Sequence, residues 1–150
     1  MGSENYRPHE SLGYLDHRTS RLIRKYLNKE LARKGYRLTG EQYDVLVQLW
    51  YRDEQHQQEL ARALFKDKTT MTRLINSIEA LNLVKRTSNR KDKRQKSVCL
   101  TASGKELMKD LNGLAQTALG KALKGIRPSD MAVCRNVLMQ LNDALSRELA

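Results

Sequence analysis

The 150-residue sequence predicts a mainly α-helical protein that carries one small β-hairpin. Along most of the chain, apolar residues recur at steps of three and four, as in helices that bury one side. The segment from Lys85 to Lys96 breaks this pattern, with seven basic residues and one acid in twelve positions. Short apolar runs flank it, Leu83-Val84 before and Val98-Cys99-Leu100 after. These runs can pair as strands, which makes the charged segment the tip of a hairpin.

Three helices are predicted before the charged region. The first is long and ends near Gly35. Thr39 and Gln42 resemble a capping box that begins the second helix, and a polar connection over residues 52–55 precedes a short third helix. The apolar positions that support these three helices are Leu12, Leu15, Leu22, Ile23, Tyr26, Leu27 and Leu31, then Val45, Leu46, Leu49 and Trp50, then Leu60, Ala61 and Leu64.

A fourth helix is predicted to begin at Asp67, whose carboxylate can accept the unpaired backbone N–H groups of the first turn. Its apolar positions form a single stripe that we expect to be buried, namely Met71, Leu74, Ile75, Ile78 and Leu81. Its other side carries side chains suited to phosphates and base edges, namely Lys68, Thr69, Thr70, Thr72, Arg73 and Asn76. Arginine pairs best with guanine and asparagine best with adenine. A helix of this kind followed by a basic hairpin is the arrangement of a winged helix-turn-helix.

Two long helices are predicted after the hairpin. One begins near Gly104, and the other has Pro128 in its first turn, where the missing N–H costs nothing. Because the helices at both ends of the chain are so apolar, we expect them to pack against a second copy of the chain. The predicted fold is therefore mainly α with a small β-hairpin wing, a winged helix-turn-helix domain flanked by N- and C-terminal dimerisation helices.

The positive charge of the chain is concentrated near the hairpin. Residues 62–105 have a net charge of +9 out of a total of +11, and the other 106 residues share +2. Charge concentrated in this way favours binding to a polyanion. The basic segment from Lys85 to Lys96 has no aromatic residues on which the bases of single-stranded RNA could stack, which favours duplex DNA.

Other features bear on cellular location and chemistry. No apolar run approaches the length of a membrane span, and the N-terminus lacks the apolar core of a signal peptide. Cys99 and Cys134 have no metal-ligand spacing, so we expect a cytoplasmic protein with reduced thiols and no cofactor. The three histidines are dispersed and no catalytic motif is present, so we do not expect an enzyme. His56 and Glu59 could share a metal, although such a pair is more often a surface contact.

Three segments together resemble the signature of the MarR family. They are Leu83-Val84 with Arg86, then Arg90-Lys91-Asp92-Lys93-Arg94, and Leu100-Thr101-Ala102-Ser103-Gly104. In that signature an Asp-x-Arg at the wing tip is followed by a Leu-Thr-x-x-Gly that opens the next helix. Asn82 departs from the pattern, because family members usually have glycine there. Asparagine is the next best residue for a left-handed helix end, so we expect the turn to be retained.

The resemblance implies a single MarR-type domain over residues 1–150. Residues 39–101 would form the DNA-binding lobe, and residues 8–35 and 103–150 the dimerisation helices. The protein would be a homodimeric, ligand-responsive transcription regulator, expected to be a repressor. Arg94 would enter the minor groove and Asp92 would orient the wing. By the same resemblance, Arg90, Lys91 and Lys93 would bind phosphates while Thr70, Thr72, Arg73 and Asn76 face the major groove.

How such a regulator would be switched is left open by the sequence. One hypothesis is a pocket for a small aromatic or phenolic effector, lined by Tyr14, His17, Arg18, Tyr43, Val47, Trp50 and Tyr51. The alternative is that the aromatic residues belong to the core and Arg18 is solvated. Redox sensing is disfavoured, because peroxide-responsive family members have a reactive cysteine near the start of the first helix. Here Cys99 and Cys134 are expected to be small buried hydrophobes.

A different function class also fits the basic charge. Phosphate contacts carry no sequence information, so an architectural protein that binds nucleic acid without sequence preference would look similar. The effect of replacing Arg73 on the preference for one base pair would separate the two classes.

Overall fold

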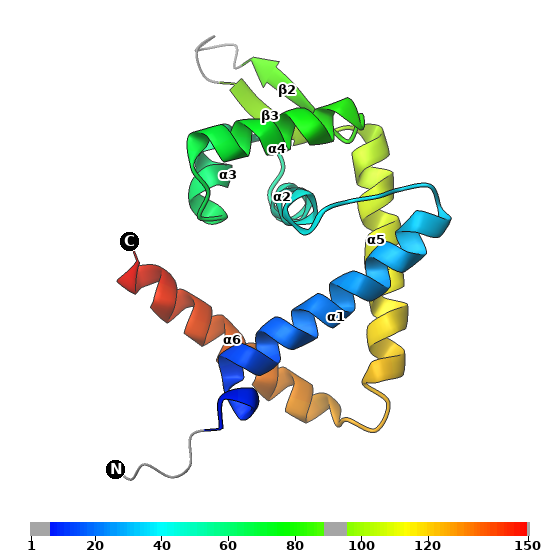
Figure 1. Cartoon of the computed structure of the whole chain (residues 1–150), viewed down its shortest axis with the longest axis vertical. Coiled ribbons are helices and arrows are strands. Elements are labelled where there is room, and N and C mark those ends of the chain that lie inside the picture. Colours follow the sequence, from blue (N-terminus) through cyan, green and yellow to red (C-terminus); the bar gives the residue numbers. More distant parts are fainter. Residues whose placement is uncertain (1–6, 89–95, 150) are drawn as a thin grey trace. The chain divides into compact units, whose positions relative to one another are not determined.

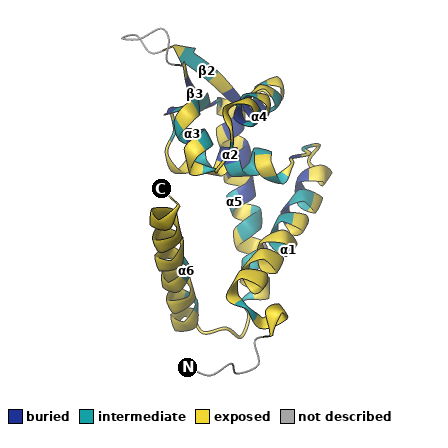
Figure 2. Cartoon of the chain, turned by 60° about the vertical axis from the view of Figure 1, so that its left-hand side comes forward, coloured by how far each residue is buried: buried dark blue, intermediate teal, exposed yellow. Residues whose placement is uncertain are grey.

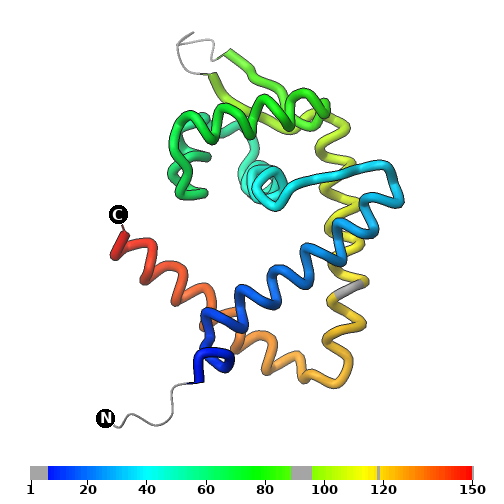
Figure 3. Tube along the Cα trace, in the orientation of Figure 1, coloured from blue at the N-terminus to red at the C-terminus, as the bar shows by residue number. Residues whose placement is uncertain are grey.

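The computed structural model describes residues 7–88 and 96–149. They form two units, the first reaching Gln116 and the second beginning at Thr117, and each is described by itself. Figures 1 and 3 follow the chain through these elements. In order they are a short 3-10 helix (Pro8–Glu10), α1 (Leu12–Arg33), α2 (Gly40–Tyr51), β1 (Gln55–His56), α3 (Gln57–Ala63), α4 (Lys68–Ala80), β2 (Val84–Ser88), β3 (Lys96–Leu100), α5 (Ala102–Ala122) and α6 (Pro128–Glu148). The prediction of a mainly helical chain with a hairpin wing is confirmed.

Local hydrogen bonds set the helix ends, as the sequence predicted. Thr39 Oγ1 accepts from the backbone N–H of Gln42 at 3.2 Å, and Gln42 Oε1 accepts from that of Thr39 at 2.9 Å, so the capping box of α2 is confirmed. Past the end of α1, Gly35 has a φ of +85°, which glycine adopts without steric cost. Asn82, with a φ of +58°, makes the left-handed turn after α4, also as predicted.

The wing is part of a three-stranded antiparallel sheet in the order β1-β3-β2. In the predicted hairpin, Val84 pairs with Leu100 and Arg86 with Val98. The third strand, β1, was not predicted. It consists of two residues within and just after the expected polar connection, and Gln55 pairs with Val98.

The core of the first unit lies between the helices and this sheet. Helices α2 and α3 pack against α4, and α4 packs against β2. In Figure 2 the buried residues lie mainly on α2, α4, the strands and the first part of α5. Helix α1 adds Leu27 and Leu31 from its second half, and α5 adds Leu107, Met108 and Leu111. Hydrophobic burial thus fixes α4 and the sheet on which the predicted site stands.

Large apolar side chains are exposed along two of the long helices, α1 and α6. In the first half of α1, Leu12, Leu15 and Leu22 are about half exposed, at 47%, 47% and 58%. In the second unit, α6 begins with Pro128 in its first turn, as predicted, and has no buried residue. Its Val133 is 63% exposed and its Leu145 51%. Among the described residues, no helix is both long enough and apolar enough to span a membrane.

Candidate nucleic-acid interface

The predicted reading helix is α4, and its first turn is capped as expected. Asp67 Oδ1 accepts from the backbone N–H of Thr70 at 2.8 Å, and Asp67 Oδ2 accepts from the Thr70 hydroxyl at 2.7 Å. These hydrogen bonds, the backbone one first, lower the pKa of the Asp67 carboxyl below its ordinary value. The negative charge also interacts favourably with the positive end of the helix dipole.

The apolar side of α4 is buried, with one correction. Met71, Ile75 and Ile78 are completely buried and Leu74 nearly so, whereas Leu81 is 47% exposed. The prediction for Leu81 was wrong because the helix ends at Ala80 and the chain turns away at Asn82. The helical spacing of apolar residues predicts which side is buried only as far as the helix extends.

The opposite side of α4 carries the predicted DNA-contacting side chains. Lys68, Thr69, Arg73 and Asn76 are exposed, while Thr70 and Thr72 are half-buried. Thr69, Thr72, Arg73 and Asn76 share this face of α4, and Lys68 and Thr70 lie at its edges. The five predicted wing-tip residues, Arg90, Lys91, Asp92, Lys93 and Arg94, lie outside the described residues, so their roles remain predictions.

One contact between wing and helix was missed at the sequence level. Arg86 of β2 donates through Nη1 to Glu79 Oε2 and through Nη2 to Asn76 Oδ1, the latter at 2.6 Å. Its backbone N–H also donates to Glu79 Oε1, at 3.2 Å. A signal was present, because strand alternation puts Arg86 on the same face as the buried Val84. An arginine on an inward face needs a partner.

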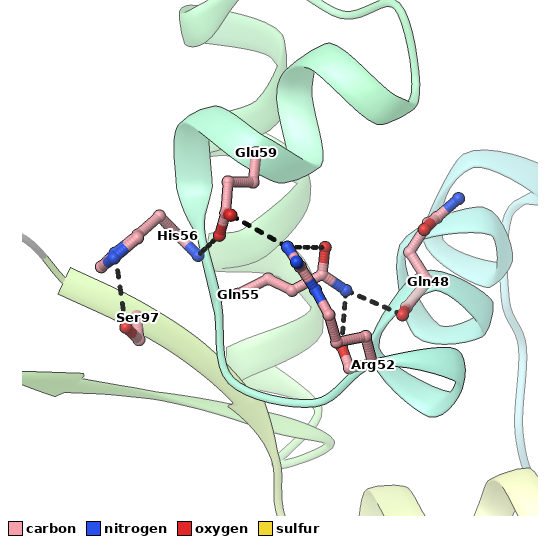
Figure 4. A network of polar contacts seen from close by, with 6 residues as sticks. All are labelled: Gln48, Arg52, Gln55, His56, Glu59 and Ser97. Carbon is pink, nitrogen blue, oxygen red and sulfur yellow. Dashed lines mark hydrogen bonds and ion pairs between the residues drawn. The ribbon is translucent and has the colours of Figure 1, made fainter.

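A polar network links the end of α2 and the turn after it to β1, the start of α3 and β3 (Figure 4). The buried side chain of Gln55 donates to the carbonyl oxygens of Gln48 and Arg52. Glu59 accepts from the backbone N–H of His56 at 2.8 Å and from Arg52 Nη2 at 2.9 Å. The His56–Glu59 pair therefore has a capping role. Within the described ranges, no group of three or more residues is placed to hold a metal ion.

A hollow of about 790 Å³ lies beside α3, the start of α4 and β3. It is lined by His56, Gln57, Gln58, Glu59, Ala61, Arg62, Lys68 and Lys96. Three of these are exposed cations, from three different elements. Arg62 and Lys96 were not in the predicted set. Their place near α4 extends the positive surface beyond the reading helix, which suits a phosphate backbone.

The structure brings together only part of the predicted effector pocket. Tyr14, His17 and Arg18 of α1 line an open hollow of about 730 Å³, together with Arg21, Leu22, Arg24, Lys25, Asn28 and Gly40. The four predicted residues of α2 do not line it. Tyr43 packs at the edge of the core, where burial raises the pKa of its hydroxyl, and Tyr51 is 89% exposed.

The two cysteines differ in their surroundings. Cys99 is partly buried in the wing sheet, and this burial raises the pKa of its thiol, which lowers the fraction of reactive thiolate. Cys134 is exposed, so the expectation that it is buried was wrong. Its apolar stripe on α6 is not covered within the second unit.

Comparisons with known proteins agree with this geometry. A model of the MarR family matches residues 38–95. The HTH-type transcriptional regulator TtmR of Methylorubrum extorquens is 36% identical over 85 residues, which are 57% of this chain and 44% of TtmR. The chain thus spans less than half the length of that relative.

Solved structures match over more of the chain. The crystal structure of transcriptional regulator PA3341 is 31% identical, with a TM-score of 0.74 over 91% of this chain and 99% of that one. CouR from Rhodococcus jostii RHA1, crystallised with p-coumaroyl-CoA, shares the fold at 24% identity. Its TM-score is 0.72 over 91% of this chain and 95% of CouR.

Proposed function

Because the chain belongs to the MarR family of winged helix-turn-helix transcriptional regulators, we propose that it binds a specific double-stranded DNA sequence as a homodimer. We further propose that it represses transcription in the cytoplasm and is released from DNA by a small-molecule effector. The observation that carries the proposal is the exposed polar face of α4, fixed by the buried stripe behind it. A helix of 13 residues with such a face fits the major groove.

The electrostatics around α4 support duplex DNA as the partner. Lys68, Arg62 and Lys96 surround the hollow beside the helix, and the wing begins four residues after α4 ends. Phosphate contacts of this kind orient the protein, and base contacts from α4 then supply specificity. The wing tip, with Arg94 in the minor groove, would extend the contact to each side of the site.

The exposed apolar residues support a homodimer. Half of α1 and all of α6 present large side chains such as Leu22 and Val133 to solvent in the single chain. Exposed apolar area of this extent is typical of a surface that another protein covers. A second copy is the most economical partner, and its two-fold axis would place the two α4 helices about 34 Å apart on a pseudo-palindromic operator.

The cationic hollow on α1 supports a response to an anionic ligand. Arg18, Arg21, Arg24 and Lys25 line it together with the aromatic ring of Tyr14, as an aromatic acid would require. Arg24 also binds Asp44 of α2 at 2.9 Å, which connects the hollow to the DNA-binding lobe. A ligand that drew Arg24 away from Asp44 would change the position of α1 relative to α2. A coupling of about 1 to 3 kcal/mol is enough to release DNA several-fold or more.

The test is the affinity for DNA from the promoter beside the protein's own gene, compared with a scrambled duplex across a salt series. A dimer that neutralises about eight phosphates should give a log-log slope near −7 on both duplexes. We expect the native duplex to bind at least ~10³-fold more tightly. Equal binding would refute specific regulation and favour the architectural alternative. A screen in which Arg18→Ala changed no ligand's affinity would refute the effector hollow.

A further inference from the structure

Several polar side chains on α4 already have partners within the protein. The Thr70 hydroxyl donates to Asp67 Oδ2 at 2.7 Å, and the Thr72 hydroxyl donates to the carbonyl oxygen of Lys68 at 2.8 Å. Thr72 Oγ1 also accepts from Gln57 Nε2 at 2.6 Å. A hydroxyl has one proton to donate. These two threonines therefore offer DNA only their oxygen lone pairs, and the donors of this face come from other residues.

The side chain of Asn76 also has a partner within the protein. Its Oδ1 accepts from Arg86 Nη2 at 2.6 Å. A guanidinium has donors and no acceptor, so the amide must turn its oxygen toward Arg86 and its NH₂ group to the other side. Asn76 is exposed, so this NH₂ group can donate to a ligand.

Glu79 holds Arg86 in this position. The Arg86 side chain is only 20% exposed, and it donates from both its guanidinium and its backbone N–H to the Glu79 carboxylate. Charge-assisted contacts of this kind are stronger than neutral ones, and separating the pair would leave a half-buried cation without its counter-ion. The arrangement should therefore persist when DNA binds.

We propose that Arg86, anchored by Glu79, determines the base preference of Asn76 by holding its amide oxygen toward the wing strand, so that the NH₂ group is the part of the amide that faces a ligand. An asparagine that recognises adenine must accept from N6–H and donate to N7 at the same time. With its oxygen turned toward Arg86, Asn76 cannot present oxygen and NH₂ side by side to adenine, and its NH₂ group instead selects guanine, whose N7 and O6 both accept, or the O4 of thymine. Arg86 is a positioning residue in this account. The inference rests on the proposed function.

The first test is a base scan of the operator with the wild-type protein and Asn76→Ala. The variant should fold, because the position is exposed and alanine favours helices. One base pair should lose its preference only in Asn76→Ala. The wild type should prefer guanine or thymine there by roughly 5- to 100-fold over adenine. If guanine is preferred, 7-deazaguanine, which lacks the N7 acceptor, should weaken binding by the wild type and not by Asn76→Ala.

The second test releases the amide. Arg86→Met should shift the preference at the same base pair toward adenine, because the Asn76 amide could then turn its oxygen and its NH₂ group to the base together. The matched control is Arg33→Met, which also removes an arginine paired with a glutamate, Glu30 at 3.0 Å on α1. The control should keep the wild-type preference. Should Arg86→Met fail to fold, the base scan of the wild type and Asn76→Ala decides the matter alone.

The outcomes separate this inference from the function on which it rests. Adenine preferred by the wild type at the Asn76-dependent pair, or an unchanged preference in folded Arg86→Met, would overturn the role of Arg86 and leave specific DNA binding intact. The same holds if Asn76→Ala alters no base preference while other positions remain selective. A wild type that binds every duplex equally would overturn both proposals.

Discussion

Replacing Gly104 with alanine is expected to destabilise the protein, although alanine is the better helix former. Gly104 lies in the first turn of α5, and a Cβ atom built there would be 2.0 Å from the carbonyl oxygen of Leu83. Real contacts of a Cβ essentially never fall below 3.0 Å, so the two segments would have to separate by about 1 Å. The same carbonyl accepts from the backbone N–H of Thr101 at 3.0 Å, and that bond would be weakened by the shift.

The magnitude follows from three contributions. Forcing extra atoms into a packed site costs about 1 to 3 kcal/mol. Weakening the hydrogen bond from Thr101 costs up to about 1 kcal/mol. The helix propensity of alanine offsets about 1 kcal/mol of this. The net loss in the free energy of unfolding is about 2 kcal/mol, which for a chain of this size lowers Tm by roughly 4 to 8 °C.

Thermal unfolding followed by circular dichroism checks the prediction, with Gly113→Ala as the matched control. Gly113 lies in the same helix, and a Cβ there would meet nothing within 4 Å. The control should therefore gain only the stabilisation that comes from the higher helix propensity of alanine, and its Tm should rise by about 2 to 4 °C. Opposite signs for the two variants are the essential result. If Gly104→Ala were as stable as Gly113→Ala, the close approach of α5 to Leu83 would not exist as described.

Four further predictions concern the caps, the reading helix and the wing. Thr39→Ala removes half of the capping box of α2 and should cost about 1 kcal/mol, measured by urea unfolding. The pKa of the Asp67 carboxyl is lower in the folded state than in the unfolded state, so the charged carboxylate stabilises the fold at pH values above the unfolded pKa of about 4. This stabilisation is lost as the pH falls through the pKa of the folded state. Asp67→Asn keeps a capping oxygen, so its melting temperature should fall less steeply between about pH 5 and pH 2 than that of the wild type. Arg73→Ala should lose its preference at one operator base pair by about 1 to 3 kcal/mol, and an unchanged base scan would contradict its role. Burial raises the pKa of the Cys99 thiol and so lowers the fraction of thiolate that peroxide can oxidise, and we expect mild peroxide to leave the DNA affinity unchanged. A loss of binding that a thiol reverses would show that a cysteine is redox-sensitive.

The features that were predicted correctly depend on residues close together in the chain. The caps at Thr39 and Asp67 are formed with residues three positions later, so their patterns are complete in the sequence. Strand β1 was missed because two residues have no measurable period. Leu81 was placed on the buried stripe because periodicity alone does not fix where a helix ends.

For the site, the sequence predicted which face of α4 is exposed and could not predict its internal partners. The pairing of Arg86 with Asn76 joins a strand to a helix ten positions away, and it depends on how the strand packs. The effector residues show a similar limit. A helical pattern identified Tyr14, His17 and Arg18 as neighbours on α1, but it could not show which side of α2 faces them.

Because β3 lies between β1 and β2, a movement of the segment that carries β1 is passed on to the wing. β1 joins the middle of β3 to the turn that follows α2, and at the base of the wing the backbone N–H of Leu100 donates to Asp53 Oδ1 in that turn at 2.9 Å. The five residues of β3 span about 17 Å, so a tilt of roughly 5° at the base would move the far end by about 1.5 Å. That displacement exceeds the range of about 0.5 Å over which a hydrogen bond is retained. If the wing contacts DNA as proposed, a slight rotation of α2 would be amplified at the wing into the loss of a groove contact, without any helix or strand having to unfold.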